Sequence, residues 1–233
     1  MVFSRKKAKK ITVAVMVFTA TFLAVFHLSK IFASQVFKTH ASLFTVVIDA
    51  GHGGIDGGVS GVNTKVKESD LNLDIAKKLK AEFESAGIKA IMTRSSYGGL
   101  YGTTAKGFKL RDMKKRIEII NSANADLMIS VHLNCYSSPN RRGATTFFGQ
   151  GKTQGQRLAS CIQKRFNLLS GQTRDFNPLK GDYYLLNYSA CPSVICECGF
   201  LSSPEDEKLL LTEDYRNEIA KSIFLGAVEF LLE

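Results

Sequence analysis

Histidine and cysteine are scarce in this chain, and their scarcity limits the sites that it can build. Its 233 residues include five cysteines, an odd number without the paired spacing of a zinc knuckle. A complete disulfide framework is therefore excluded. Of the four histidines, His27 and His40 lie in the first 40 residues. The rest of the chain has only His52 and His132 for chemistry that needs an imidazole.

Signals for nucleotide binding and for repeated modules are also absent. The glycine-rich segment 51–58 has neither a Walker lysine nor a Gly-x-Gly-x-x-Gly pattern leading into a helix, so it does not predict a phosphate cradle. We expect its glycines to let the backbone turn sharply around His52. No internal repeat or low-complexity tract is present. Chain length and a hydrophobic content of 45% predict one well-buried domain with a short appendage.

Acidic residues are missing from the first 40 positions, and this absence explains most of the net charge of +10. Seven of the 31 Lys and Arg residues lie there, five of them between positions 5 and 10. The remainder of the chain carries the other 24 basic residues against 21 acidic ones. This near balance gives no reason to expect nucleic acid as a partner.

An uncharged apolar run, residues 11–28, follows the basic segment 1–10. As a helix it would span roughly 27 Å, close to the hydrocarbon thickness of a bilayer. The basic residues before it predict a cytoplasmic N-terminus and a domain outside the membrane. We favour an uncleaved transmembrane anchor, because the run is longer than the apolar core of a typical signal peptide; cleavage near Ala33 would instead give a secreted chain. Residues 29–42 are expected to form a linker.

Strand and helix patterns alternate over residues 43–233, which predicts a single α/β domain. Apolar strands are expected at residues 44–49, 88–93, 127–131, 144–148 and 194–196. Helices are expected around Leu71–Phe83 and Leu110–Ile120, at residues 154–169 and at residues 219–232. Apolar strands separated by helices predict a mostly parallel twisted sheet with helices on both faces.

His52 and His132 each follow the carboxyl end of a predicted strand, where an open α/β sheet places its ligands. This shared rim favours a common metal site over two structural histidines. A catalytic zinc site needs a third protein ligand and keeps one position for water. Glu68, at the start of a predicted helix, is the best candidate, although a charge favourable to the helix N-terminus would be a simpler role. Asp49 and Asp56 are weaker ligand candidates, and Asp49 could instead orient His52.

Glu197 is a candidate proton carrier on the last predicted strand. It follows the uncharged residues 194–196 and should emerge at the same rim. A carboxylate there can take a proton from water and return it to a leaving amine. The alternative is a carboxylate that closes a surface turn.

Four motifs in order resemble the zinc-dependent N-acetylmuramoyl-L-alanine amidases, which cut the amide bond between muramic acid and the peptide stem of peptidoglycan. They are residues 47–54 (VIDAGHGG), 67–73 (KESDLNL), 130–134 (SVHLN) and 197–200 (ECGF), and the likeness covers residues 44–233. By this resemblance His52, Glu68 and His132 would bind one zinc ion and Glu197 would be the catalytic acid and base. Asn134 would contact the substrate. The implied fold is an α/β sheet with flanking helices.

Within that family the chain is most similar to the sporulation amidases of the CwlD type. They share a short anchored N-terminus, a catalytic domain without a wall-binding module, and a stretch like residues 102–107 before a basic helix. The likeness implies removal of stems from spore cortex for muramic δ-lactam formation, in the cell envelope or the forespore intermembrane space. A cell-separation or autolytic amidase, and one assisted by an accessory protein, are the alternatives. Segment 135–143 is too short for a helix that plugs the site, which predicts an open groove.

Three thiols near the predicted site depart from the family pattern. Cys196 and Cys198 flank Glu197, and Cys135 lies three residues past His132. Strand alternation predicts that the two flanking thiols point away from Glu197, although oxidation or metal capture there stays open. Two further hypotheses are a Cys-His hydrolase using Cys135 with His132, which a chelator would spare, and a module that binds glycan without cutting it.

Overall fold

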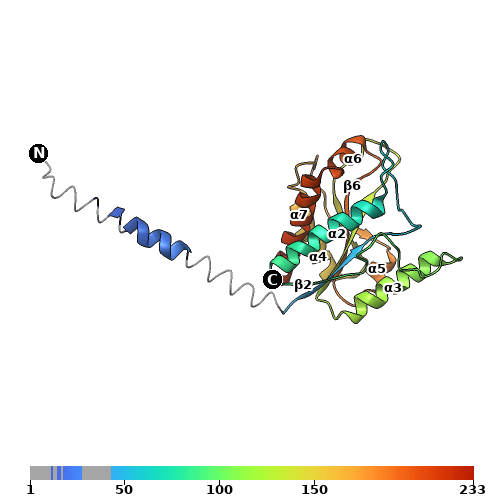
Figure 1. Ribbon diagram of the computed structural model, residues 1–233, viewed down its shortest axis with the longest axis horizontal. Coiled ribbons are helices and arrows are strands. Elements are labelled where there is room, and N and C mark those ends of the chain that lie inside the picture. The colour runs from blue at the N-terminus through green and yellow to red at the C-terminus, as the bar shows by residue number, and fades with distance from the viewer. Residues whose placement is uncertain (1–11, 13–14, 17, 28–42) are drawn as a thin grey trace, which may run out of the picture. The chain divides into compact units, whose positions relative to one another are not determined.

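The computed structural model describes residues 12, 15–16, 18–27 and 43–233 (Figure 1). The chain divides into two compact units, Met1–Leu43 and Phe44–Glu233. The described residues up to position 27 are helical. Over the part of the chain that the structure describes, no helix is both long and apolar enough to cross a membrane. The expected span at residues 11–28 lies partly outside the described residues, and the expected segments 1–10 and 29–42 lie wholly outside them.

The second unit is built on a six-stranded sheet with the strand order β2-β1-β3-β6-β4-β5. Neighbouring strands are parallel except β6 and β4, which are antiparallel. The α/β class is confirmed, but the sheet is mixed, because the connection 135–144 between β3 and β4 contains no helix and returns the chain in the opposite direction. The strands are β1 (Thr45–Ala50), β2 (Lys89–Met92), β3 (Leu127–Asn134), β4 (Thr145–Gly149), β5 (Leu179–Gly181) and β6 (Ser193–Phe200).

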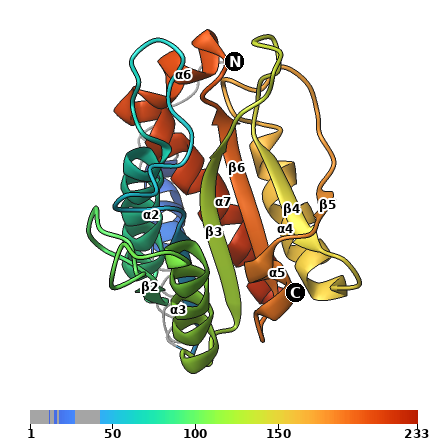
Figure 2. The same cartoon turned by 90° about the vertical axis from the view of Figure 1, so that its right-hand side faces the viewer.

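Helices cover both faces of the sheet, as predicted. One face carries α2, α4 and α7, and the opposite face carries α3 and α5, which lie in front of the strands in Figure 2. The short elements β5, α5 and α6 were not expected, and α7 begins at Glu213, where Thr212 accepts a hydrogen bond from the Tyr215 N–H. The helices are α2 (Glu68–Ser85), α3 (Phe108–Ser122), α4 (Thr153–Phe166), α5 (Tyr184–Tyr188), α6 (Pro204–Leu210) and α7 (Glu213–Leu232).

The sheet face under α3 and α5 turns from apolar to polar along β1 and β3. Val47 and Met128 pack there with Ile120 of α3 and Leu185 of α5. Because side chains two residues apart share a face, Asp49, Ser130 and His132 follow on the same side. The helices bury the apolar part, and the polar part remains for the site.

Strands β3 and β6 extend beyond their predicted ends. His132 and Glu197 were expected just past the strands, but both lie inside them and are paired in register. The backbones of β3 and β6 remain paired through these polar residues. The pairing places the Glu197 side chain beside that of His132 on one face.

Candidate active site

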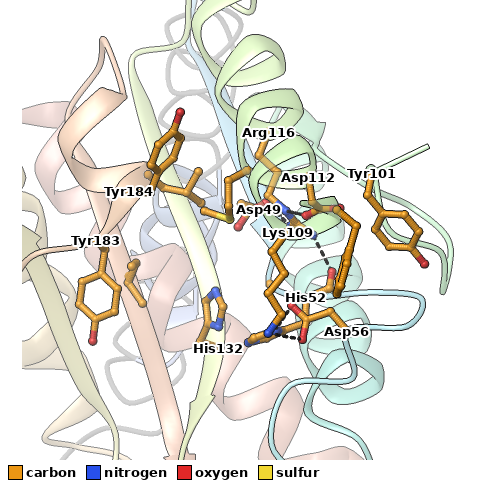
Figure 3. Close-up of a pocket in the computed structure, with 15 residues that line it drawn as sticks. Asp49, His52, Asp56, Tyr101, Lys109, Asp112, Arg116, His132, Tyr183 and Tyr184 are labelled. Atoms are coloured by element: carbon orange, nitrogen blue, oxygen red, sulfur yellow. Dashed lines mark hydrogen bonds and ion pairs between the residues drawn. The ribbon is translucent and has the colours of Figure 1, made fainter. Parts of the chain in front are cut away.

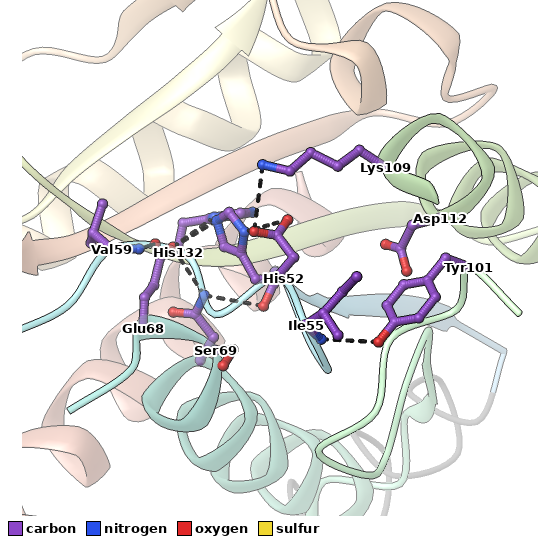
Figure 4. Close-up of polar contacts among 12 residues, drawn as sticks. His52, Ile55, Val59, Glu68, Ser69, Tyr101, Lys109, Asp112 and His132 are labelled. Atoms are coloured by element: carbon purple, nitrogen blue, oxygen red, sulfur yellow. Dashed lines mark hydrogen bonds and ion pairs between the residues drawn. The ribbon is translucent and has the colours of Figure 1, made fainter. Parts of the chain in front are cut away.

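His52, Glu68 and His132 are brought together from three elements. His52 lies in the loop after β1, Glu68 is the first residue of α2, and His132 belongs to β3. Oε1 of Glu68 lies 3.3 Å from Nε2 of His52 and 3.0 Å from Nδ1 of His132 (Figure 4). Tetrahedral zinc ligands, at about 2.0–2.1 Å from the ion, lie about 3.3 Å apart. The three side chains, whose ligand atoms all lie within 4.8 Å of one another, therefore form a site that could hold a metal ion.

The backbone around His52 is shaped for this approach. His52 has a φ of 60°, a left-handed conformation that is strained for a residue with a side chain. A Cβ at Gly51 would lie 2.2 Å from Cε1 of His132, so a glycine is required there. Nδ1 of His52 lies 3.0 Å from Oδ2 of Asp56. Asp56 thus orients the His52 ring, a role for which the sequence had suggested Asp49.

Asp49 serves instead in a buried polar cluster beneath the His52 loop. It accepts hydrogen bonds from Arg116, Ser130 and Thr93, each at 2.6 Å. Burial raises the pKa of Asp49, but the guanidinium of Arg116 and the two hydroxyl groups more than offset this and lower it to about 2. The ionised carboxylate in turn balances the charge of a fully buried arginine.

Two arginines that sequence reasoning missed hold the loop backbone. Arg94 donates to the carbonyl oxygens of residues 50 and 51 at 2.8 and 2.9 Å. Arg116 donates to those of residues 50 and 52 at 2.8 and 2.6 Å. Arg94 follows β2 at the same rim as the histidines, a signal that would have found it. Arg116 resembled a solvated helix charge, because arginine is rarely buried.

Glu68 is hydrogen-bonded through both oxygens. Oε1 accepts from the Leu133 N–H and the Asn72 side chain, both at 3.1 Å, and Oε2 accepts from the Val59 N–H at 2.9 Å. In the metal-free protein burial opposes ionisation, yet His132 and His52 hold the pKa of Glu68 well below its ordinary value. Burial also disfavours the charged form of His52 and so lowers its pKa, but Glu68 and Asp56 more than offset this and raise the pKa to about 9. Glu68 is therefore a fixed anion.

Glu197 differs from Glu68, because one of its oxygens has no such partner among the described residues. It is 9% exposed, and its Oε2 accepts no hydrogen bond from any residue that the structure describes. Burial raises its pKa to about 7 in the metal-free protein, with Glu68 adding to the rise and His132 and His52 opposing it. A buried carboxyl group that titrates near neutral pH can both accept and release a proton.

A pocket of about 250 Å³ opens beside the two histidines (Figure 3). The charged residues of its lining are Lys109 and Arg116, together with the carboxylates of Asp49, Asp56 and Asp112. The segment 135–143 contains no helix, as expected for an open groove. Aromatic and aliphatic side chains form most of the walls: Tyr101, Phe108, Met113, Tyr183, Tyr184, Leu185 and Ile195.

Asn134 and the thiols lie around this site in different ways. Oδ1 of Asn134 accepts the Cys135 N–H at 2.8 Å, and its expected contact with substrate stays a prediction. Cys196 and Cys198 are buried and alternate with Glu197 along β6, which places them on the other face. Burial raises the pKa of both thiols. Cys135 is exposed, and the nearby His132 turns Nδ1 toward Glu68.

Known proteins match both the sequence and the fold. The family model described as N-acetylmuramoyl-L-alanine amidase matches residues 46–229. The germination-specific N-acetylmuramoyl-L-alanine amidase of Bacillus subtilis is 33% identical over 192 residues, which cover 81% of this chain and 80% of that protein.

Two solved structures have a similar fold. The CwlD amidase from Clostridioides difficile, in complex with the GerS lipoprotein, has a TM-score of 0.77 and 36% identity, covering 81% of this chain and 98% of that one. An N-acetylmuramoyl-L-alanine amidase from Clostridium difficile 630 has a TM-score of 0.73 and 29% identity, covering 82% and 97%. The chain is similar to amidases of the CwlD type. It thus belongs to the N-acetylmuramoyl-L-alanine amidase family and is an enzyme of that activity, acting on peptidoglycan.

Proposed function

We propose that this amidase is zinc-dependent and that His52, Glu68 and His132 hold the ion. The observation that carries the proposal is the convergence of two imidazoles and one ionised carboxylate within 4.8 Å. This donor set is one that catalytic zinc sites use. When bound, zinc would supply Lewis acidity, which polarises a carbonyl group and lowers the pKa of water. Asp56 and Arg116 hold the His52 ring and backbone in place for it.

Glu197 is assigned the proton transfers. Its free Oε2 accepts a proton from the attacking water, whose oxygen forms the new bond to the muramoyl carbonyl carbon. Oε2 of Glu197 then donates this proton to the alanine nitrogen as the amide C–N bond breaks. The products are a muramic acid carboxylate and a free peptide stem. A divalent cation nearby would lower the pKa of Glu197 below the metal-free value of about 7, so the group starts the reaction ionised.

Metal removal tests this chemistry. The purified domain is treated with a chelator, and the release of peptide stems from peptidoglycan is measured before and after zinc is restored. We expect the activity to disappear and to return with zinc. A thiol hydrolase would survive the chelator, and a non-catalytic binding module would release no stems in either state.

We also propose that the substrate in the cell is spore cortex, from which the enzyme strips stems so that muramic δ-lactam can form. Similarity to a germination-specific amidase and to CwlD supports this role. The test is muropeptide analysis of spores from a deletion strain. We expect the δ-lactam to be absent and to return with the parent gene but not with Glu197→Gln. Normal cortex together with unseparated vegetative cells would favour a cell-separation amidase.

A third part of the proposal concerns location and partner. Residues 11–28, apolar and preceded by five basic residues, would tether the domain on the outer side of a membrane. A reporter fused after residue 40 should then lie outside, whereas a cytoplasmic reporter, or a shortened and released chain, would argue against the tether. The CwlD structure with a lipoprotein supports an accessory protein for this enzyme too. Adding such a protein, captured from sporulating cells, should raise the rate of stem release.

A further inference from the structure

The pocket beside His52 and His132 offers apolar walls and few free polar groups. Each of its carboxylates has a cationic or imidazole partner: Arg116 lies 2.6 Å from both Asp49 and Asp112, and Nδ1 of His52 lies 3.0 Å from Asp56. The Tyr101 hydroxyl accepts the Ile55 N–H at 2.9 Å. A sugar ring would have to bury several hydroxyl groups against walls that offer them few partners, which is unfavourable. A peptide with a small apolar side chain and one charged group is better matched to this surface.

Lys109 supplies the charge that such a peptide would need. It lies in the first turn of α3 and reaches over the His52 loop toward the metal ligands (Figures 3 and 4). Its side chain is 70% exposed, and Nζ lies 3.6 Å from Oδ1 of Asp56. One exposed pair of this kind contributes little, and an ammonium group has three donors. Lys109 therefore remains available to a ligand, in contrast to the buried Arg116.

We infer that this pocket receives the peptide stem rather than the glycan, and that Lys109 determines specificity by pairing with a free carboxylate on the stem. The inference rests on the proposed function, because it takes the scissile amide to lie at His52 and His132. The apolar walls formed by Phe108, Met113 and Ile195 would limit water around the bound stem and strengthen the pair. A stem whose carboxyl group is amidated offers no charge and loses this contact.

The test compares two peptidoglycan fragments that differ only at the second stem residue, a glutamate with a free α-carboxylate or its carboxamide. We expect the parent enzyme to prefer the carboxylate by about fivefold in kcat/KM, the factor for a pair worth about 1 kcal/mol. Lys109→Met should lose this preference and Lys109→Arg should keep it. Raising the salt concentration to about 1 M should narrow it, because the pair is screened.

Lys114→Met is the matched control, since Lys114 is an exposed lysine on the same helix and does not line the pocket. It should retain the parent preference. Binding of both fragments to the Glu197→Gln variant in the presence of zinc repeats the comparison without turnover. Equal use of the two fragments by the parent, or a preference that survives in Lys109→Met, would overturn the inference and leave the proposed function standing. A preference set by glycan length would place sugar in the pocket and also overturn it. Cleavage of neither fragment would contradict both.

Discussion

The two acidic residues of the site lie in opposite surroundings, although both are buried. Glu68, at the start of α2, accepts hydrogen bonds on both oxygens and has a pKa well below its ordinary value. Glu197, inside β6, has an oxygen without a partner among the described residues and a pKa raised to about 7. Burial alone would raise both values. Local donors and the two histidines therefore decide which glutamate is a fixed anion and which can carry a proton.

Removal of the fixed anion should have the largest effect. In Glu68→Gln the histidines lose the charge that balances a cation, and a carboxylate ligand becomes a weak neutral one. We expect zinc to be lost on dialysis and stem release to fall to background. Zinc content and turnover are measured together, with Glu118→Gln, an exposed acid on α3, as the control. Full retention of zinc would show that Glu68 is structural.

Glu197→Gln should separate chemistry from metal binding. The amide keeps the size of the side chain but cannot accept the proton, so turnover should fall by at least about a hundredfold. Zinc content and binding to peptidoglycan should stay near the parent values, because the ligands and the pocket persist. Near-normal stem release would show that another group moves the proton and that the contrast with Glu68 has no catalytic meaning.

Sequence patterns located the metal-binding candidates because parallel strand ends and a helix start meet at one edge. His52, His132 and Glu68 follow from that geometry and from their motifs. The partners of these residues were harder to predict. Which aspartate reaches His52 depends on a left-handed turn at that residue, and no periodic pattern encodes it. Oε2 of Glu197 has no partner among the described residues, and the sequence does not predict this because hydrogen-bond donors could come from segments far along the chain.

Some elements of the fold escaped prediction for the same reason. β5 and α5 are too short to show a hydrophobic period. The helix-free connection 135–144 reverses the direction of β4, but the strand with which β4 pairs, β6, lies far along the chain, so the antiparallel pair shows no local pattern. The apolar strands β1 and β3 were predicted because a run buried on both faces needs no partner to be recognised.

The contrast should also appear in the stability of the metal-free protein. The pKa of Glu197 rises from 4.5 to about 7 on folding, so its contribution to stability declines as the pH rises through that interval and is fully unfavourable above it. Glu197→Gln should then raise the free energy of unfolding by about 1–3 kcal/mol at pH 8 and leave it unchanged at pH 4. Denaturant titrations with chelator present measure this. An equal change at both pH values would point to packing rather than ionisation.

The smallest effect is expected from Cys135→Ser, which tests whether a thiol, rather than the two glutamates, takes part in the reaction. Cys135 is exposed and lies three residues past His132, whose Nδ1 is 3.0 Å from Glu68. The imidazole thus turns Nδ1 toward another metal ligand, and among the described residues no hydrogen bond joins it to the Cys135 thiol. We expect kcat/KM within about twofold of the parent enzyme, since no step of the proposed mechanism passes through sulfur. Stem release is measured with and without chelator, and alkylation of the parent enzyme provides an independent check. A loss of activity as large as that of Glu197→Gln, in a variant that keeps its zinc, would move the nucleophile to the thiol and leave Glu197 as a buried acid without a part in the reaction.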